Sequence, residues 1–529
     1  MAYSVLITDS VDPVCIDMLK ENGIEANVQL KKSHDELKEL AKTADGWIIR
    51  SGTTITGDLI EAAKNLKVIG RAGVGVDNVD LTTATRKGVL VINAPDGNTI
   101  STAEHTCAML MALARHIPQA SASMREGKWD KKRFTGSELY EKTLGIVGLG
   151  KIGQAVAERM KGFGMRLIGF DPLLSPEVAE RIGVKLVTMD EIFAESDFIT
   201  MHTPLNEATR GLFNRETLKK CKKGVRLVNC ARGGIIDEAA LLEALESGQV
   251  GGAALDVFSK EPPPPELEAL LKHPNLIATP HIAASTAEAQ EKVAIQITEQ
   301  VILALNGQPV SSPVNRMEIK MAASPEVQPY LTLADKLGQI VGQLSSGPLE
   351  RISIRCVGDI PRRYTDVLSI AAVKGVMGRW TNEPVNLINA PFLAEEMGLR
   401  IEEQRGTAKG HYTNLIEITL EGPDGSHEVA GTVFENQDLR LVRLDDFWLE
   451  VRPEGNLLFY RNVDRPGMLA AVGSVLAENN INIGALALGR SGKGSMALTA
   501  ISVDEDIPEA VEQRIAGVEG VESVRVVSL

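Results

Sequence analysis

Short runs of hydrophobic residues alternate with amphipathic runs through the first 97 residues. The short runs are typical of strands buried in a parallel sheet, and runs with hydrophobic residues every three or four positions are typical of helices. The predicted strands are 5–7, 47–49, 68–69 and 89–92, and the predicted helices are 15–19, 37–40 and 59–62. This alternation predicts a small α/β domain with a parallel sheet.

A second α/β pattern follows, with more strands. Ser101 and Glu104 have the spacing of a capping box ahead of the hydrophobic run 107–114, so a long helix is predicted to begin there. Strand-like runs then recur at 144–147, 167–170, 198–201, 226–228, 253–257 and 276–278. Six parallel-type strands with helices between them predict a doubly wound nucleotide-binding domain.

After this domain the pattern predicts a return to the first one. The amphipathic run 285–306 predicts a helix that leads the chain back, and four prolines in the polar sequence 307–329 predict a linker. The prolines are Pro309, Pro313, Pro325 and Pro329. We therefore expect a discontinuous substrate-binding domain, residues 1–97 with 286–317, around a nucleotide domain of residues 98–285.

The C-terminal half predicts two further domains. Residues 318–452 combine helical runs at 331–344 and 367–377 with a hairpin, and so predict an α+β intervening domain. The hairpin strands are 415–420 and 427–433, joined through 422–425. Residues 453–529 show the order strand, helix, strand, strand, helix, strand, which predicts a ferredoxin-like βαββαβ domain.

Composition narrows the class of protein. The net charge of −14 without a Lys/Arg-rich run argues against nucleic acid or an anionic membrane as a main partner. The five cysteines are scattered and never form C-x-x-C, which argues against a disulfide framework or a metal site and favours a reducing compartment. No apolar run reaches transmembrane length and the sequence shows no leader pattern, so a cytoplasmic location is expected.

A glycine pattern lies at the start of the doubly wound domain. Gly148, Gly150 and Gly153 form G-x-G-x-x-G between a strand and a helix: the first permits a tight turn, the second a close approach of the phosphates, and the third close packing of helix on strand. Asp171 follows the next strand, where a carboxylate accepts from a ribose 2′-hydroxyl and repels a 2′-phosphate. The pattern predicts binding of NAD rather than NADP.

Three candidate catalytic residues follow late strands of this domain. His281 can exchange a proton with a hydroxyl, Glu261 can hold the other imidazole nitrogen, and Arg232 can bind a carboxylate bidentately. Singly, each has an ordinary structural alternative: a loop histidine, a surface acid or an ion-paired arginine. Arg50 and Arg71 follow strands of the first domain, and are candidate anion contacts or solvated surface arginines.

These motifs carry a resemblance. The segments 148–153, 229–237, 254–262 and 280–283 resemble the D-2-hydroxyacid dehydrogenase family, and the whole chain resembles its long, phosphoglycerate-oxidising form with an intervening domain and a C-terminal ACT domain. The resemblance implies Arg232 as substrate clamp, Glu261 as partner and His281 as acid/base. It also implies cofactor contacts at Val74, Lys151, Ile152, Asp171, Thr203, Cys230, Ala231, Asp256, Ile282, Ala283 and Ala284, besides the three glycines.

The resemblance further implies substrate, effector and assembly. Arg50, Arg71 and Arg133 become candidate phosphate contacts, with Arg133 reaching across a dimer. Asp464 and Asn482 stand where ACT domains hold serine. The implied activity is NAD-dependent oxidation of 3-phospho-D-glycerate to 3-phosphooxypyruvate, the first step of serine synthesis, by a dimer or tetramer. The alternatives are a relative that acts on glycerate or lactate, and an NAD-sensing interaction protein of the same fold.

Overall fold

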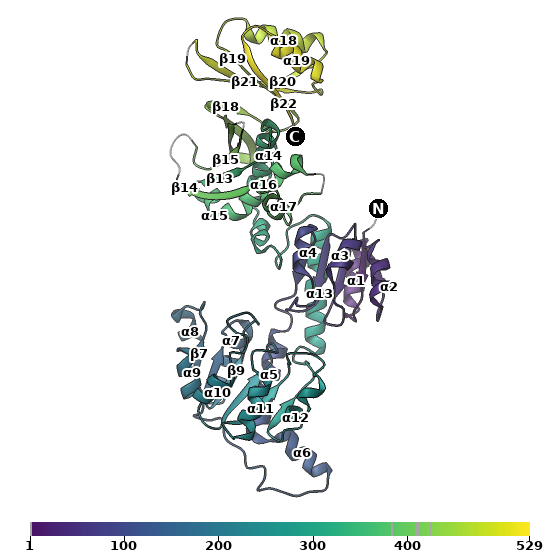
Figure 1. The fold of residues 1–529 in the computed structure, drawn as a ribbon, viewed down its shortest axis with the longest axis vertical. Helices are drawn as coiled ribbons and strands as arrows, with labels where there is room; N and C mark the ends of the chain where they lie inside the picture. Colours follow the sequence, from purple (N-terminus) through teal and green to yellow (C-terminus); the bar gives the residue numbers. More distant parts are fainter. Residues whose placement is uncertain (1–2, 382–383, 408–411, 424, 493) are drawn as a thin grey trace. The chain divides into compact units, whose positions relative to one another are not determined.

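The computed structural model describes residues 3–381, 384–407, 412–423, 425–492 and 494–529. The chain divides into two compact units, one formed by residues 1–10, 16–93 and 297–529, the other by residues 11–15 and 94–296. Figure 1 shows the course of the chain through them.

The first sheet is parallel, in the order β2-β1-β3-β4-β5, as the N-terminal pattern predicts. Its strands are β1 (Ser4–Ile7), β2 (Glu25–Val28), β3 (Gly46–Ile49), β4 (Val68–Arg71) and β5 (Leu90–Asn93). The helices between them are α1 (Val14–Glu21), α2 (His34–Ala41), α3 (Gly57–Ala62) and α4 (Leu81–Arg86). Buried side chains of α2, α3 and α4 pack with those of the strands in one core. β2 and α4 were not predicted, since both lack a clear hydrophobic run.

The second sheet is also parallel, in the order β12-β11-β10-β9-β6-β7-β8, so the direction of strand addition reverses between β6 and β9. Its strands are β6 (Thr143–Val147), β7 (Arg166–Phe170), β8 (Lys185–Leu186), β9 (Phe198–Met201), β10 (Val225–Asn229), β11 (Val250–Leu255) and β12 (Leu276–Ala278). The sheet thus has the predicted doubly wound order, with the short β8 as a seventh strand.

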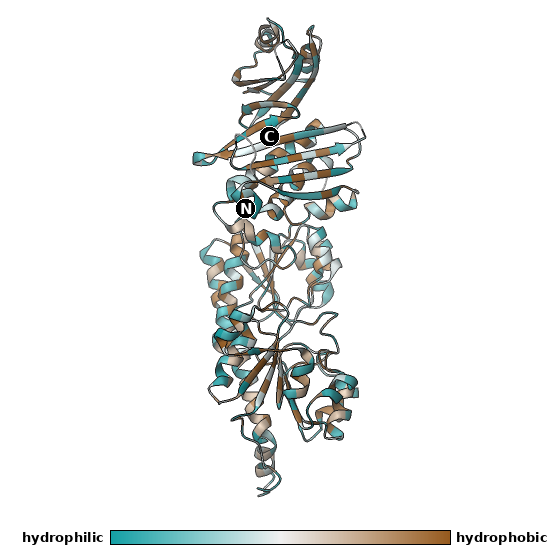
Figure 2. Cartoon of the chain, turned by 90° about the vertical axis from the view of Figure 1, so that its left-hand side faces the viewer, coloured by the Kyte–Doolittle hydropathy of each residue, from teal (hydrophilic) through white to brown (hydrophobic). Residues whose placement is uncertain are grey.

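Helices cover both faces of the second sheet. The helices of this part of the chain are α5 (Thr99–Arg115), α6 (Ile117–Arg125), α7 (Lys151–Lys161), α8 (Pro176–Ile182), α9 (Met189–Glu195), α10 (Arg215–Lys220), α11 (Glu238–Glu246), η1 (Pro265–Leu267) and α12 (Glu268–Leu271). α5 and α7 share one core with the sheet, and α9 to α12 share another. Figure 2 shows hydrophobic residues along the strands of the parallel sheets and hydrophilic residues on the outer faces of the helices.

Two predictions about the connections between the domains are wrong. α5 begins at Thr99 after an Asn98 that makes no capping hydrogen bond, so Ser101 is inside the helix, where its hydroxyl lies 2.7 Å from the Thr286 hydroxyl. The predicted linker is structured, because Val314 N–H donates to the Val91 carbonyl and η2 (Met317–Ala323) follows. The chain reaches this segment through α13 (Ala287–Leu305), the predicted return helix.

The intervening sheet has the order β14-β13-β15-β16-β17-β18 and is mixed, with only β13 and β14 parallel among its pairs. Its strands are β13 (Arg351–Val357), β14 (Arg400–Gly406), β15 (Leu415–Gly422), β16 (Gly425–Phe434), β17 (Asp438–Leu444) and β18 (Phe447–Val451), and η3 is Glu435–Gln437. The predicted hairpin is β15 and β16, and Asp424 of its turn lies outside the described residues.

Helices α14 and α16 of the intervening domain cross with their backbones in contact. The helices of this domain are α14 (Gln328–Leu344), α15 (Asp359–Arg363), α16 (Thr365–Trp380) and α17 (Ala390–Glu396). A Cβ on Gly338 would lie 2.1 Å from the Ala372 carbonyl oxygen, and one on Gly375 would lie 2.1 Å from the Asp335 carbonyl oxygen. Only glycine permits this approach at the two positions.

The C-terminal sheet is antiparallel, in the order β20-β21-β19-β22. Its elements are β19 (Asn456–Val463), α18 (Met468–Glu478), β20 (Ile483–Arg490), β21 (Met496–Val503), α19 (Glu509–Ala516) and β22 (Val521–Ser528), the predicted βαββαβ order. One face packs under α18 and α19. On the other face, Leu457, Phe459 and Leu498 belong to the same core as α14 and α16, so the last two domains share a hydrophobic core.

Candidate active site

The glycine turn joins β6 to α7. Gly148 has φ +91°, which a residue with a Cβ rarely adopts, and Gly150 is the N-cap of α7. A Cβ on Gly153 would lie 2.1 Å from the Gly148 carbonyl oxygen, so α7 approaches the turn as closely as glycine allows. The free N–H groups at the start of α7 thus adjoin a turn with little side-chain bulk, as an anion requires.

Asp171 ties this turn to the loop after β7. Its carboxylate accepts from the backbone N–H of Leu149 at 2.8 Å and from those of Leu173 and Leu174 at 2.8 and 3.2 Å. The acid therefore lies beside the glycine turn, within the loop that follows the neighbouring strand.

Two features of this region fit a dinucleotide. A Cβ on Gly150 would meet no atom within 4 Å, so the turn is open there. The Thr203 hydroxyl, after β9, is buried without a hydrogen-bond partner among the described residues. Open space at the switch point between β6 and β9, together with an unsatisfied hydroxyl beside it, suits a bound pyrophosphate and its ribose.

The three candidate catalytic residues follow adjacent strands. Arg232 comes after β10, Glu261 after β11 and His281 after β12, and the carboxyl ends of parallel strands meet at one sheet edge. Glu261 Oε2 lies 2.6 Å from His281 Nδ1, while its Oε1 accepts from the Phe258 N–H at 3.1 Å. The His281 side chain is 48% exposed, so the ring that Glu261 holds through Nδ1 is accessible to a ligand.

The loop that carries Arg232 is held by its own residues. Asn229 Oδ1 accepts from the Ala231 N–H at 3.0 Å, and Asn229 Nδ2 donates to the Arg232 carbonyl at 2.9 Å. A Cβ on Gly233 would lie 1.9 Å from the Phe258 carbonyl oxygen, so this loop packs directly on the loop that leads to Glu261.

Asp256, at the end of β11, anchors the loop that carries His281. The carboxylate is fully buried and accepts from the N–H groups of Ile282 and Ala283, each at 2.9 Å, and from the Thr279 hydroxyl. His105 Nε2 on α5 lies 3.5 Å from the same carboxylate. Burial alone would raise the pKa of Asp256, but these hydrogen bonds outweigh it and hold the pKa below its usual value.

The anchoring roles of Asp256 and His105 were missed in the sequence. The family resemblance implies a cofactor contact at Asp256, and in the structure its buried carboxylate accepts from the backbone N–H groups of Ile282 and Ala283. In the sequence, His105 is a single histidine in the apolar run of α5. Such a histidine is usually a hydrogen-bonded core residue, so the sequence alone does not indicate that it contacts Asp256.

Comparison with known proteins covers the whole chain. Residues 107–283 match the D-isomer specific 2-hydroxyacid dehydrogenase NAD-binding domain, residues 326–445 the D-3-phosphoglycerate dehydrogenase intervening domain, and residues 456–520 the ACT domain. D-3-phosphoglycerate dehydrogenase of Bacillus subtilis is 41% identical over 527 residues, which cover 100% of both chains. The Synechocystis enzyme of that name is 42% identical over 99% of this chain and 94% of its own.

This chain belongs to the D-3-phosphoglycerate dehydrogenase family. Its nucleotide domain is therefore an NAD-binding domain. Among solved structures, a glyoxylate reductase from Paecilomyes thermophila matches with a TM-score of 0.54 and 30% identity, over 59% of this chain and 98% of that one. D-lactate dehydrogenase from Escherichia coli matches with a TM-score of 0.53 and 29% identity, over 59% and 99%.

The other cofactor positions predicted from the family resemblance occupy several loops. Lys151, the first residue of α7, pairs with Asp96, and Ile152 follows it. Cys230 is buried, which raises the pKa of its thiol to about 12 and keeps it protonated. The remaining positions are Ala231 after β10, Ile282 to Ala284 after β12, and Val74 after β4, whose carbonyl accepts from Asn93.

The candidate phosphate contacts lie in two places. Arg50 follows β3 and donates from its backbone to Asp9 and from Nη1 to the Ser10 carbonyl. Arg71 ends the adjacent strand β4, so these two arginines share one sheet edge. Arg133 is exposed in the segment after α6, with its guanidinium 5.6 Å from the Phe134 ring centre.

The candidate effector residues lie in two loops beside different strands of the ACT sheet. Asp464 follows β19 and accepts from the Gly494 N–H at 3.1 Å and from Arg490 at 3.2 Å, which lowers the pKa of its carboxyl. Asn482 precedes β20 and donates to Asp504 at 2.7 Å. Because β21 lies between β19 and β20, the structure does not bring Asp464 and Asn482 into a shared hydrogen bond.

None of the helices in the described part of the chain combines the length and apolar character that crossing a bilayer needs.

Proposed function

We propose that this protein oxidises 3-phospho-D-glycerate to 3-phosphooxypyruvate with NAD, the first step of serine synthesis. The observation that carries the proposal is the Glu261–His281 pair, which follows strands adjacent to that of Arg232, in a chain whose full-length relatives are named D-3-phosphoglycerate dehydrogenase. NAD supplies the hydride acceptor, bound through the positions predicted from the family resemblance, with Asp171 selecting it over NADP. Asp256 acts indirectly in this proposal, by holding the N–H groups of Ile282 and Ala283.

His281 is the acid/base in this proposal. Its Nε2 takes the proton of the C2 hydroxyl as the C2 hydrogen leaves with its electron pair, and returns a proton in the reverse reaction. Glu261 fixes Nδ1 at 2.6 Å, so the imidazolium that forms is stabilised and correctly oriented. Arg232 binds the substrate carboxylate and polarises the oxygen that becomes the carbonyl.

The phosphate is assigned to arginines outside this trio. Arg50 and Arg71, at the ends of β3 and β4, are the proposed contacts of one subunit, and Arg133 the contact from a second. Supporting an assembly, the region of α6 and the segment after it exposes large apolar side chains. They are Ile117 (54% exposed), Met124 (54%), Trp129 (74%) and Tyr140 (63%). Such side chains favour burial against another copy, so we propose a homo-oligomer paired through the nucleotide domains.

The ACT domain is proposed to bind serine through Asp464 and Asn482. If so, the double variant Asp464→Ala/Asn482→Ala should lose inhibition by L-serine and keep its turnover. Serine inhibition that persists unchanged would place the effector elsewhere. We also propose the domain limits and the cytoplasmic location expected from the sequence. The location is supported by the five cysteines, which are buried and form no disulfide.

The decisive experiment compares substrates. NADH formation is measured with 3-phosphoglycerate and with D-glycerate, and kcat/KM should be at least a hundredfold higher for the phosphorylated compound. Equal values would refute the phosphate assignment and favour a relative that acts on glycerate or lactate. Arg71→Gln should raise KM for 3-phosphoglycerate while leaving the small activity on glycerate unchanged.

The acid/base role has its own test. His281→Asn should bind NADH normally and lose at least a thousandfold in kcat, in line with the loss of a general base. Unchanged turnover would exclude this role. A protein that bound NADH but oxidised none of these hydroxy acids would be the NAD-sensing alternative.

A further inference from the structure

The loop that carries Arg50 is held from two sides. It runs from Arg50 to Thr53, directly after β3, at the sheet edge where ligands of parallel sheets bind. β1 and β4 are the two neighbours of β3 in this sheet. Asp9, which follows β1, contacts the loop on one side, and Asn78, which lies between β4 and α4, contacts it on the other.

Asp9 uses both carboxylate oxygens on this loop. Oδ2 accepts from the backbone N–H groups of Arg50 and Thr53 at 2.6 and 3.1 Å, and Oδ1 accepts from the Thr53 hydroxyl at 2.9 Å. A Cβ on Gly52 would lie 2.6 Å from Oδ1, so the loop closes on the carboxylate as tightly as a glycine permits. Because the acceptor is charged, these three hydrogen bonds are stronger than bonds to a neutral oxygen.

Asn78 holds the same loop through two of its carbonyl groups. Its side-chain Nδ2, which carries two N–H donors, donates to the carbonyls of Arg50 and Thr53 at 2.7 and 2.5 Å. The backbone adds two bonds, since the Ile55 N–H donates to the Asn78 carbonyl at 2.8 Å and the Asp80 N–H donates to the Ile55 carbonyl at 3.0 Å. The loop after β3 is therefore tied to the segment after β4.

The Arg50 guanidinium stays available to an anion. Its Nη1 donates to the Ser10 carbonyl at 3.3 Å, which is a neutral partner, and the side chain forms no ion pair with a carboxylate among the residues that the structure describes. The neighbouring Asp9 carboxylate accepts from the loop N–H groups instead. A guanidinium without a charged partner can bind a phosphate through its N–H donors, and a fixed backbone limits the positions that it can reach.

We propose that Asn78 and Asp9 are positioning residues for the phosphate of the substrate, because they fix the backbone from which Arg50 reaches it. This inference rests on the function proposed above, in which Arg50 contacts that phosphate. Asn78 and Asp9 act through Arg50 and do not touch the substrate. They set the discrimination between phosphorylated and unphosphorylated 2-hydroxy acids, while proton and hydride transfer depend on the nucleotide domain.

The test pairs Asn78→Ala with Asn315→Ala. Asn315 also uses its side-chain amide on backbone groups of the first sheet: Nδ2 donates to the Val89 carbonyl and Oδ1 accepts from the Val91 N–H, each at 2.9 Å. These groups lie near the start of β5, at the other end of the parallel strands from the Arg50 loop. Both variants should lose stability, but only Asn78→Ala should affect the choice of substrate.

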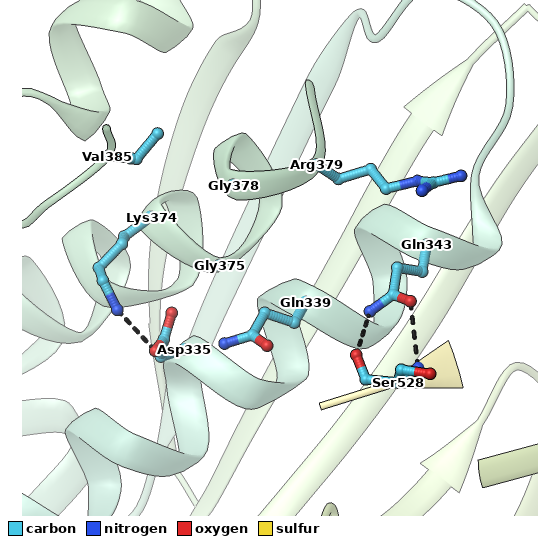
Figure 3. A pocket seen from close by; sticks show the side chains of 9 residues that line it. All are labelled: Asp335, Gln339, Gln343, Lys374, Gly375, Gly378, Arg379, Val385 and Ser528. Atoms are coloured by element: carbon cyan, nitrogen blue, oxygen red, sulfur yellow. Dashed lines mark hydrogen bonds and ion pairs between the residues drawn. The ribbon is translucent and has the colours of Figure 1, made fainter. Parts of the chain in front are cut away.

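A second control lies outside this domain. The side-chain amide of Gln343 on α14 pairs with the backbone of Ser528 on β22: Nε2 donates to the carbonyl at 2.9 Å, and Oε1 accepts from the N–H at 3.2 Å (Figure 3). Gln343→Ala therefore removes two bonds of the same kind from another part of the chain. It should leave the choice of substrate unchanged.

For each variant, NADH formation is measured with 3-phosphoglycerate and with D-glycerate under saturating NAD. Asn78→Ala should raise KM for 3-phosphoglycerate at least tenfold, with its kcat and the kcat/KM for D-glycerate each changed less than threefold. Arg50→Gln should raise the same KM at least tenfold. Adding Asn78→Ala to Arg50→Gln should raise this KM less than twofold further, because Asn78 acts through Arg50. Both controls should keep the wild-type KM within twofold.

The outcomes separate this inference from the reaction on which it rests. A wild type without a preference for 3-phosphoglycerate would overturn the proposed function and this inference with it. If the wild type has the preference, the positioning role alone is wrong when Arg50→Gln keeps it, when Asn78→Ala behaves like its controls, or when the effects of the two variants add fully. Should Asn78→Ala not fold, Asp9→Asn takes its place, since one amide oxygen cannot serve the three donors, and an unchanged KM there contradicts the role equally.

Discussion

Replacing Asp256 should harm catalysis much more than cofactor binding. Its carboxylate accepts from the N–H groups of Ile282 and Ala283, the two residues after His281. His281 itself has φ +53°, a left-handed conformation that costs a non-glycine residue about 1–2 kcal/mol and so depends on its surroundings. In Asp256→Ala nothing replaces the acceptor, and the loop is free to leave this conformation.

The size of the effect follows from the two hydrogen bonds. A hydrogen bond to a charged group contributes about 1.5–3 kcal/mol, so the pair fixes the loop by about 3–6 kcal/mol. Ile282 is 40% exposed and its N–H regains water when the loop opens, so we take the lower end. About 3 kcal/mol corresponds to roughly a hundredfold lower population of the productive loop and a similar fall in kcat.

The assay pairs Asp256→Ala with Asp237→Ala. Asp237 is the N-cap of α11 and also accepts from two backbone N–H groups, those of Ala239 and Ala240, at 3.0 Å each. Both variants should lose stability, but only Asp256→Ala should lose about a hundredfold in kcat, with the Kd for NADH changed less than fivefold. Equal kcat in the two variants, at a similar fall in Tm, would refute the anchoring argument.

Three further predictions concern neighbouring residues. Glu261→Gln keeps an oxygen that can accept from the Phe258 N–H, but it removes the negative charge beside His281. Under saturating NAD, kcat should therefore fall about 10–100-fold with little change in KM. Gly153→Ala places a Cβ 2.1 Å from the Gly148 carbonyl oxygen, so calorimetry should show at least tenfold weaker NAD binding; equal affinity would mean that the turn yields at no cost. Burial lowers the pKa of His202 to about 4, below the unfolded value, so its contribution to stability is complete above about pH 6.5 and lost as the pH falls through 4. Between pH 7 and 5 the free energy of unfolding of the wild type should fall by at most about 2 kcal/mol more than that of His202→Asn. Denaturant unfolding at each pH measures this difference.

The sequence predicts the order of elements well where hydrophobic periodicity is strong. Strands of both parallel sheets, the hairpin of β15 and β16 and the βαββαβ order of the last domain all follow from such runs. Prediction from the sequence fails where contacts between distant segments determine the local structure. The capping-box prediction at Ser101 is wrong because the serine is used inside α5, toward Thr286. No local pattern distinguishes these two uses of one hydroxyl.

The same limit applies to the segment after α13. Prolines and polar residues predict a linker, but Val314 bonds to Val91, more than two hundred residues earlier. The core shared by β19 and α14 is likewise invisible in a linear pattern, because each domain alone shows a complete set of elements. Candidate catalytic residues can be proposed because they follow strands, whereas the buried anchor role of Asp256 needs three dimensions.

The glycine crossing of α14 and α16 constrains how the intervening domain can move. Helices that pack through side-chain ridges can slide between alternative seatings, which is the shear type of motion. At Gly338 and Gly375 the carbonyl oxygens of the opposite helix occupy the place of a side chain. The two helices therefore have no alternative packing arrangement that they could reach by sliding. We therefore expect the two helices to move together as one rigid unit. Any rearrangement of the domain then requires hinge bending in the segments at their ends.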